Sequence, residues 1–365
     1  MLYACRVLER KETTLSTELS RPRPVTIQDV ARAAGVSRAA VSKVIRDAPG
    51  VSTAMRTRVN AAIDELGYRP SVAARAMRGA SYTLGLEIPR FGNQFLTQVI
   101  DGARDALEGT PYQLVIAPAH GEGYSAIEAL VDRQVDGLIA VSPLVEPAWL
   151  ERLAERISVV MIGRHDRARN YDTVVGDDVS GSREVMAHLL QLGHRRIAHV
   201  TESEAVTAPG SRTPHAFRLE TYTECMFEAG YAKHIKVVRT GSTEDDAYRS
   251  TMELIGARDR PTAIFAGHDQ LAIGVLAALA DAGLSAPEIS VVGYDNTRIA
   301  SHPGISLTSV DQFGEVMGRK AIAMLLERMR GRAEPRGYAL TPQLRIRRST
   351  GPAVPRPVGL DHTDD

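Results

Sequence analysis

Strand-like and helix-like segments alternate along the chain from residue 81 to residue 330, and this alternation limits the possible folds more than any other feature. Apolar runs typical of strands occur at 83–88, 113–117, 137–141, 159–162, 173–175, 196–201, 235–238, 263–266 and 290–293. Helix-like stretches lie between most of them, including 95–108, 125–133, 181–192, 271–282 and 314–330. Such alternation builds parallel sheets with helices on both faces. Since roughly 270 residues exceed a single sheet, two similar α/β lobes are predicted.

The segment before these lobes has the spacing of a small all-helical unit. Thr26 and Asp29 stand in capping-box positions at the start of one short helix, and Gly35 permits the turn that ends it. Ser37 is a suitable N-cap for a second helix. Three apolar residues of that helix share an inward face: Val41, Val44 and Ile45. Two short helices around a glycine turn form a helix-turn-helix unit, and a third helix follows Ser52.

A short run rich in small side chains follows Pro70, at residues 71–78. About eight residues are too few for a stable isolated helix, because nucleation costs more than the few hydrogen bonds return. We therefore predict a hinge helix that forms only when another molecule or chain supports it.

Charge is distributed unevenly, although the whole chain is formally neutral. Residues 21–80 hold 11 Lys/Arg against 4 Asp/Glu, a net charge of +7, whereas residues 81–365 hold 30 against 37, a net charge of −7. A basic segment joined to a larger acidic one indicates an anionic polymer bound at one end.

Cysteine content and hydropathy narrow the cellular setting. Two cysteines, Cys5 and Cys225, make no disulfide framework and no cysteine-based zinc cluster. No apolar run reaches membrane-spanning length, and residues 1–20 lack the apolar core of a secretory signal. The sequence therefore predicts a cytoplasmic protein without a membrane partner, metal or cofactor.

Several motifs in order resemble the lactose-repressor (LacI/GalR) family of bacterial transcription regulators over nearly the whole chain. In the small unit these are Val-Thr-Ile-Gln-Asp-Val-Ala at 25–31, Ala-Gly-Val-Ser at 34–37, Val-Ser-Lys-Val-Ile at 41–45 and Leu-Gly-Tyr-Arg-Pro at 66–70. In the lobes they are Leu-Gly-His-Arg-Arg-Ile at 192–197, His-Asp-Gln-Leu-Ala-Ile-Gly at 268–274 and Ser-Val-Val-Gly-Tyr-Asp at 290–295. The resemblance implies a repressor that binds a near-palindromic DNA operator as a homodimer under the control of a small effector.

The resemblance also implies which residues contact DNA. Arg38, Ala39 and Lys43 occupy the family's base-reading positions; Arg and Lys can donate to guanine, and Ala can touch a thymine methyl group. Thr26, Ser37 and Ser42 suit phosphate contacts, although the first two also serve as helix caps. In the hinge, Met77 stands where the family has a minor-groove leucine wedge, flanked by Arg75 and Arg78; packing within a hinge dimer is the alternative role for Met77.

Effector contacts are expected where strands end, in a cleft between the lobes. Four candidates lie at family effector positions: Arg218, His268, Asp295 and Phe313. Five others follow strands or begin the helices after them: Phe91, Asn93, Phe95, Arg164 and Asp178. Carboxylates, an arginine and aromatic faces suit vicinal hydroxyls, so a sugar or sugar derivative is the preferred effector, with a nucleobase or another small metabolite as the alternative.

Two departures from the family pattern affect this prediction. His268 replaces the usual asparagine, and Asp269 after it can serve simply as a helix cap. The stretch 202–215 is longer and more irregular than its family counterpart and is a candidate cover for the cleft.

These features predict five regions with an order and a boundary for each. They are an N-terminal extension without structure (1–24), the DNA-binding domain (25–70), the hinge helix (71–79), a two-lobed domain like the periplasmic binding proteins (80–351) and a tail without structure (352–365). The fold class is thus a small all-α domain plus hinge joined to a two-lobed α/β domain with parallel sheets.

Two other functions fit parts of the chain. The stretch Gly121–Ala126 matches the permissive dinucleotide fingerprint of a nicotinamide-dependent enzyme, but it stands at the second strand–helix turn, where the fingerprint belongs at the first. A solute-binding protein would carry a signal peptide and no helix-turn-helix. No catalytic residue is predicted.

Overall fold

The computed structural model describes residues 23, 25–69, 81–121, 123–285 and 288–354. The chain divides into two compact units, Met1–Arg75 and Ala76–Asp365. The predicted hinge helix (71–79), with Arg75, Met77 and Arg78, lies outside the described residues, as do most of the two terminal extensions. At the C-terminal end, Ala353 donates a backbone hydrogen bond to Leu192 (2.8 Å), so part of the tail predicted to lack structure is held in place.

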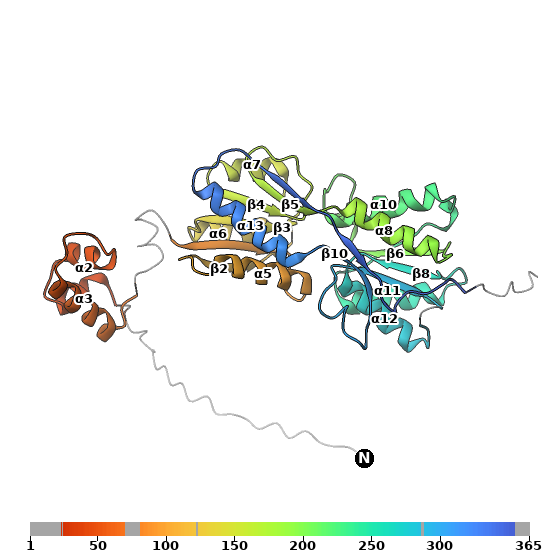
Figure 1. The fold of residues 1–365 in the computed structure, drawn as a ribbon, viewed down its shortest axis with the longest axis horizontal. Helices are drawn as coiled ribbons and strands as arrows, with labels where there is room; N and C mark the ends of the chain where they lie inside the picture. The colour runs from red at the N-terminus through yellow and green to blue at the C-terminus, as the bar shows by residue number, and fades with distance from the viewer. Residues whose placement is uncertain (1–22, 24, 70–80, 122, 286–287, 355–365) are drawn as a thin grey trace, which may run out of the picture. The chain divides into compact units, whose positions relative to one another are not determined.

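The described residues of the small unit form three helices: α1 (Ile27–Ala33), α2 (Arg38–Ile45) and α3 (Thr53–Leu66) (Figure 1). Each helix has a hydroxyl residue as its N-cap, namely Thr26, Ser37 and Ser52 respectively. The hydroxyl oxygen of each cap accepts a hydrogen bond from a backbone N–H in the first turn of its helix. The apolar residues predicted to face inward do so, and fully buried Val30, Val41 and Val59 come from one helix each. Gly35 and Gly67 have φ of +64° and +60°, the left-handed conformation that ends a helix.

The large unit contains two parallel-dominated sheets with helices between their strands. Its strands are β1 (Thr83–Ile88), β2 (Gln113–Pro118), β3 (Gly137–Val141), β4 (Ser158–Ile162), β5 (Asp172–Gly176), β6 (Ile197–Thr201), β7 (Lys236–Arg239), β8 (Ala263–Ala266), β9 (Ser290–Tyr294), β10 (Thr308–Asp311), β11 (Gly337–Leu340) and β12 (Gln343–Arg345). Its helices are α5 (Gln94–Leu107), α6 (Tyr124–Asp132), α7 (Pro147–Ala154), α8 (Asp178–Gln191), α9 (Glu204–Thr207), α10 (Pro214–Glu228), α11 (Glu244–Gly256), α12 (Asp269–Asp281) and α13 (Gly314–Met329), with a 3-10 turn at Ala232–His234.

Each sheet is the centre of one lobe. The first has the strand order β11-β5-β4-β3-β1-β2 and the second β12-β10-β9-β8-β6-β7 (Figure 1). Alternate residues of β3 and β4 enter different cores: Ile139 and Val160 pack against α5 and α13, whereas Leu138 and Val159 pack against α6 and α7. This period of two is expected for a sheet covered on both faces.

Helices α5 and α13 approach closely because each contributes a glycine to their contact. A Cβ added to Gly102 would lie 1.9 Å from the Glu315 carbonyl oxygen, and one added to Gly318 would lie 2.0 Å from that of Val99. Any side chain at either position would force the two helices apart. The pair covers one face of the first sheet, and residues of both helices line the cavity described below.

Within residues 81–354, the chain passes between the lobes three times, at Asp177, at Gln312–Phe313 and at residues 341–342. The passages are tied together: Asp177 N–H donates to the Leu340 carbonyl (2.9 Å), and a Cβ on Gly176 would lie 3.2 Å from Gln312 Oε1. Because β11 and β12 belong to different sheets, the chain after α13 completes both.

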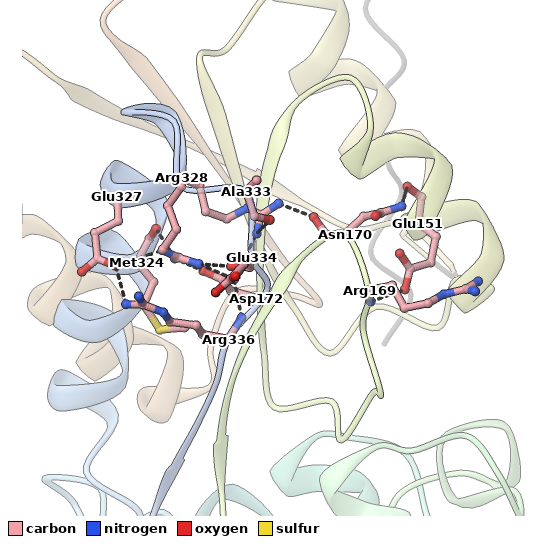
Figure 2. Close-up of polar contacts among 11 residues, drawn as sticks. Glu151, Arg169, Asn170, Asp172, Met324, Glu327, Arg328, Ala333, Glu334 and Arg336 are labelled. Atoms are coloured by element: carbon pink, nitrogen blue, oxygen red, sulfur yellow. Dashed lines mark hydrogen bonds and ion pairs between the residues drawn. The ribbon is translucent and has the colours of Figure 1, made fainter.

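Buried Asp172, at the start of β5, anchors this returning segment (Figure 2). Its carboxylate accepts hydrogen bonds from Arg328 (3.2 Å), from Arg332 and from the Arg336 backbone N–H (2.8 Å). Arg332 also pairs with Glu327 of α13 (3.0 Å). Removing one partner of a buried ion pair typically costs about 3–5 kcal/mol, so this cluster fixes α13 and β11 against β5.

Strands β1–β9 agree with the predicted strands to within a few residues. Helices α5, α6, α8, α12 and α13 agree equally well with the five helical stretches predicted by residue range. Strands β10, β11 and β12 were not among the predicted strands. Among the described residues, every helix is too short or too polar to span a bilayer.

Candidate functional site: a DNA-reading surface and an effector cavity

We call the outward side of α2 and its cap the reading surface, after the DNA contacts predicted for Ser37, Arg38, Ala39, Ser42 and Lys43. Inward Val41 and Val44 are buried, which turns Arg38, Ala39 and Lys43 outward, where they are exposed. Ser42 is half-buried. Among the described residues, Arg38 and Lys43 form no ion pair, so their side chains are free to donate to base edges.

The two cap residues differ in what they can offer a phosphate. Ser37 Oγ accepts the Ala40 N–H (3.1 Å), and its own proton has no acceptor among the described residues. Thr26 donates its hydroxyl proton to Asp29 (2.7 Å) and accepts the Asp29 N–H (3.4 Å). Ser37 can therefore donate to a phosphate without giving up its cap, whereas Thr26 must exchange a partner.

The effector cavity lies in the large unit and has a volume of about 270 Å³. Both lobes contribute to its lining. Among the predicted effector residues, five line it: Asn93, Phe95, Arg218, His268 and Asp295. The carboxyl ends of the strands thus meet around one space, as open α/β sheets require.

Four other predicted effector residues are not among those that line the cavity. Phe91 is 67% exposed, and Phe313 stands at the N-cap of α13 with φ of 57°. Arg164 is buried and donates to the carbonyls of Pro143 (2.8 Å) and Val145 (2.6 Å), so it fixes the backbone at the cavity wall. Asp178 holds Arg218 in place.

Arg218 is held by three contacts at the base of the cavity. Its Nε donates to Asp178 (2.8 Å), its Nη1 donates to the Gly267 carbonyl (2.6 Å), and its guanidinium lies 3.6 Å from the centre of the Tyr294 ring. Burial raises the pKa of Asp178, but Arg218 and then His165 outweigh burial and hold that pKa below its ordinary value. The cationic charge of Arg218 is therefore already compensated.

His268 lines the cavity as predicted, but it is also His268, and not Asp269, that caps α12. His268 is the N-cap of α12: its Nδ1 accepts the Leu271 N–H (3.3 Å), which leaves the proton on Nε2 to be donated to Glu202 (3.1 Å). Asp269 accepts from the backbone and hydroxyl of Thr297 (2.7 and 2.8 Å) and from Ser309 (2.6 Å). Asp269 thus links α12 to the loop after β9 and to β10 and makes no cap.

Asp295 lies at a bend directly after β9, in the second lobe. Its φ of 111° is rare for a residue with a side chain, and Gln312, on the second passage between lobes, donates to its carboxyl oxygen (2.5 Å). Burial raises the pKa of Asp295 well above its ordinary value. A neutral carboxyl group here can both donate to and accept from a ligand hydroxyl.

Sequence reasoning missed Glu87, which lies fully buried near the carboxyl end of β1 and lines the cavity. Its Oε2 accepts the Val141 N–H (3.1 Å), and its Oε1 has no partner among the described residues. Burial raises the pKa of Glu87 to about 8. The signal was present in the sequence: a single charged residue within an otherwise apolar run, 83–88.

Glu202 and His215 were also missed as site residues, although the stretch between them was identified as a candidate cover. Five residues of this stretch line the cavity: Glu202, Val206, Thr213, Pro214 and His215. Burial would raise the pKa of Glu202, but hydrogen bonds from His268 and Ser242 outweigh it and lower the pKa to about 2. Burial lowers the pKa of His215 to about 3, and its Nδ1 has no partner among the described residues.

A helix-turn-helix unit with an outward basic surface, joined in one chain to a two-lobed domain with a cavity at its strand ends, defines an effector-controlled DNA-binding regulator. Residues 26–71 match the family model of bacterial regulatory proteins of the lacI family, and residues 186–350 match that of a periplasmic binding protein-like domain. The chain belongs to the lacI family of bacterial regulatory proteins, which confirms the resemblance seen in the sequence.

Relatives of known name agree with this assignment over nearly their whole length. The transcriptional repressor PurR of Vibrio atlanticus is 31% identical over 89% of this chain and 98% of its own length. The ribose operon repressor of Escherichia coli is 31% identical over 83% of this chain and 93% of its own. A solved complex of the regulator CelR with cellobiose covers 89% of this chain and 99% of its own at 29% identity, with a TM-score of 0.64.

Proposed function

We propose that this protein is a transcriptional repressor that binds a near-palindromic operator as a homodimer and has no catalytic role. Its operator affinity is set by a small neutral polyhydroxylated effector, a sugar or sugar derivative, bound in the effector cavity. One observation carries the proposal: the cavity takes polar side chains from both lobes, Glu87 and Asn93 from one and Arg218, His268 and Asp295 from the other.

Direct readout by the reading surface supports the DNA part of this proposal. Arg38 and Lys43 present donors that match guanine O6 and N7, and Ala39 presents a methyl group to thymine. The net charge of +7 over residues 21–80 supplies the attraction to phosphate that precedes any base contact.

The effector class follows from charge and from hydrogen-bonding capacity. Arg218 is neutralised by Asp178. Burial raises the pKa of Glu87 to about 8 and that of Asp295 well above its ordinary value, so the neutral form of both carboxyl groups is favoured. Hydroxyl groups of a ligand can pair with such groups at little desolvation cost, whereas a phosphate would meet anionic Glu202. A volume of about 270 Å³ lies just below the usual range of ligand pockets, about 300 to 1,000 Å³, and suits a small ligand.

One competing ligand class remains. The cellobiose complex and the ribose operon repressor favour a carbohydrate, and the nucleobase that the sequence left as an alternative is the competitor. Both ligand classes are neutral, so the hydrogen-bonding pattern has to separate them.

Effector binding is coupled to operator binding if the effector has a higher affinity for one mutual orientation of the two lobes. A ligand held by both lobes stabilises the arrangement in which its contacts are complete, and it shifts the equilibrium by its differential affinity for the two states. The three passages between lobes at Asp177, Gln312–Phe313 and residues 341–342 are the places where such a reorientation would turn.

Thermal unfolding of the full chain with a panel of ligands tests the proposal. Neutral sugars, including ribose and cellobiose, are expected to raise the melting temperature more than purine nucleobases or sugar phosphates do. The active sugar is then expected to change operator affinity in a fluorescence anisotropy titration. Stabilisation by nucleobases alone, or a stabilising sugar without effect on operator binding, would contradict the proposal.

A further inference from the structure

Three potential metal ligands converge on one side of the effector cavity. Glu202 follows the end of β6, His215 lies in the first turn of α10, and His268 caps α12. One ligand atom from each lies within 4.8 Å of the others, and all three residues line the cavity. The sequence suggested no metal site, because these residues are separated by 13 and 53 positions and form no motif.

The chemical state of the three groups suits a divalent transition metal. A metal binds the neutral imidazole and the ionised carboxylate, and burial favours the neutral form of His215 and His268. Glu202 is held as an anion by donors from His268 and Ser242. Two imidazole nitrogens and one carboxylate form a ligand set that Zn²⁺ accepts, with one position left open.

A supporting shell is also present. Ser242 donates to Glu202 Oε2, which orients the carboxylate so that Oε1 faces His268. Buried Nδ1 of His215 has no partner among the described residues, and the rings of His215 and His268 are 5.4 Å apart at an interplanar angle of 76°. A buried nitrogen without a hydrogen-bond partner is destabilising, and a metal ion or other ligand would supply the missing partner.

We propose that Glu202, His215 and His268 form a binding site for a divalent transition metal ion, with Zn²⁺ as the representative ion, in the wall of the effector cavity. The proposal goes beyond the effector assignment and does not depend on which organic ligand binds. Since the three ligands line the cavity, the open coordination position faces the space where the effector is proposed to bind.

The site requires two local adjustments, both small. Bonds of about 2.0–2.2 Å place tetrahedral ligand atoms about 3.4 Å apart, so the farthest pair, at most 4.8 Å apart, closes by at most about 1.4 Å. A metal on His268 Nε2 also displaces the proton there; the proton moves to Nδ1, and the cap bond to Leu271 is lost. Losing a helix cap costs far less free energy than zinc binding supplies in full four-ligand sites.

Calorimetric titration of the full-length, tag-free chain with ZnCl₂ tests the site. One ion per chain is expected to bind. His215→Ala and Glu202→Gln are each expected to weaken binding more than about 100-fold, because even loss of a supporting contact costs 10–100-fold. Ser242→Ala, which removes only the supporting hydroxyl, is expected to weaken binding about 10-fold.

Two further variants separate loss of the site from loss of the fold. His268→Asn keeps a side chain that can cap α12 and is expected to fold and to lose zinc binding. His302→Ala removes an exposed histidine that does not line the cavity and is expected to bind zinc like the parent. Metal-free melting temperature and operator affinity report folding in each case.

Binding of Co²⁺ gives an independent measurement, because Co²⁺ bound in a four-coordinate site absorbs visible light strongly. That absorption is expected in the parent and in His302→Ala and to be absent in His215→Ala. Failure to bind one zinc ion, or zinc binding retained in both His215→Ala and His268→Asn, would overturn the site. Neither result bears on sugar binding, which the ligand panel tests separately.

Discussion

The reading surface and the effector cavity place their functional side chains in opposite ways. Arg38, Ala39 and Lys43 are exposed, and the structure assigns their side chains no ion pair among the described residues. In the cavity, Arg218, His268 and Asp295 are each at least 97% buried and engaged in hydrogen bonds. A flexible cationic surface can adapt to a DNA groove, whereas a buried network must be arranged before the ligand arrives.

This contrast shows where mutations should act. Substitutions on the reading surface should change DNA recognition and leave the fold intact, because surface changes away from caps cost little. Substitutions in the cavity should change stability and ligand binding together, because a buried polar group that loses its partner is left uncompensated.

The largest expected effect is that of Arg218→Met, which leaves the Asp178 carboxylate in a buried position without its main partner. We expect a loss of about 3–5 kcal/mol in the free energy of unfolding, measured by urea titration. Arg183→Met is the matched control, since Arg183 joins the same two helices, α8 and α10, through exposed pairs with Glu224 and Glu228. That variant should lose less than about 1 kcal/mol. Equal losses would mean that burial does not distinguish the two pairs.

Lys43→Ala tests the reading surface. Loss of a base contact should cost about 1–3 kcal/mol at one base pair of the operator, measured by anisotropy on a set of singly substituted operators. Arg32→Ala removes an exposed basic residue from the last turn of α1 and should leave the ranking of the operators unchanged. Uniform weakening on all operators would instead make Lys43 a phosphate contact.

Glu87→Gln tests the buried carboxyl group in β1. The pKa of Glu87 rises from 4.5 when unfolded to about 8 when folded, so the folded chain keeps a proton that the unfolded chain releases. The stabilisation is complete below pH 4.5 and is lost as pH rises toward 8, by about 1.4 kcal/mol per pH unit. Free energies of unfolding should therefore fall with pH in the parent relative to Glu87→Gln. Parallel pH profiles would show that Glu87 is ionised in the fold.

The smallest effect compares two equivalent caps. Thr26–Asp29 and Thr243–Asp246 form the same capping box at the start of α1 and α11. Thr26→Ala and Thr243→Ala should each cost about 1 kcal/mol of local helix stability, measured by hydrogen exchange. If Thr26 also contacts a phosphate, only its variant should weaken operator binding when all operators are compared. Identical operator affinities would restrict Thr26 to capping.

The sequence predicted the reading surface more fully than the cavity because the former depends on local spacing. Ser37 as a cap and Val41 and Val44 as the buried face are enough to turn Arg38 and Lys43 outward. The strands β1–β9 were likewise predictable, since each contains a short apolar run and helical segments separate most of them.

Cavity residues depend on tertiary arrangement, which spacing alone does not reveal. Glu87, Glu202 and His215 come from β1, from the end of β6 and from α10, and only the two sheets bring them together. Arg164 and Asp178 follow strands as predicted, but their side chains turn toward neighbouring protein groups and support the wall. Strands β11 and β12 were missed because they are short and half-exposed, so they lack the apolar runs that marked the other strands.

The returning segment after α13 sets the order in which this protein can mature on the ribosome. The first sheet lacks an outer strand until residues 337–340 have been made, and the second lacks one until residues 343–345. The helix-turn-helix unit can fold early. The edges of β5 and β10 stay unpaired until their partners, β11 and β12, have been synthesised. Unpaired edges are sites of aggregation, so a chain cut short before about residue 337 would retain its DNA reader and lose its solubility.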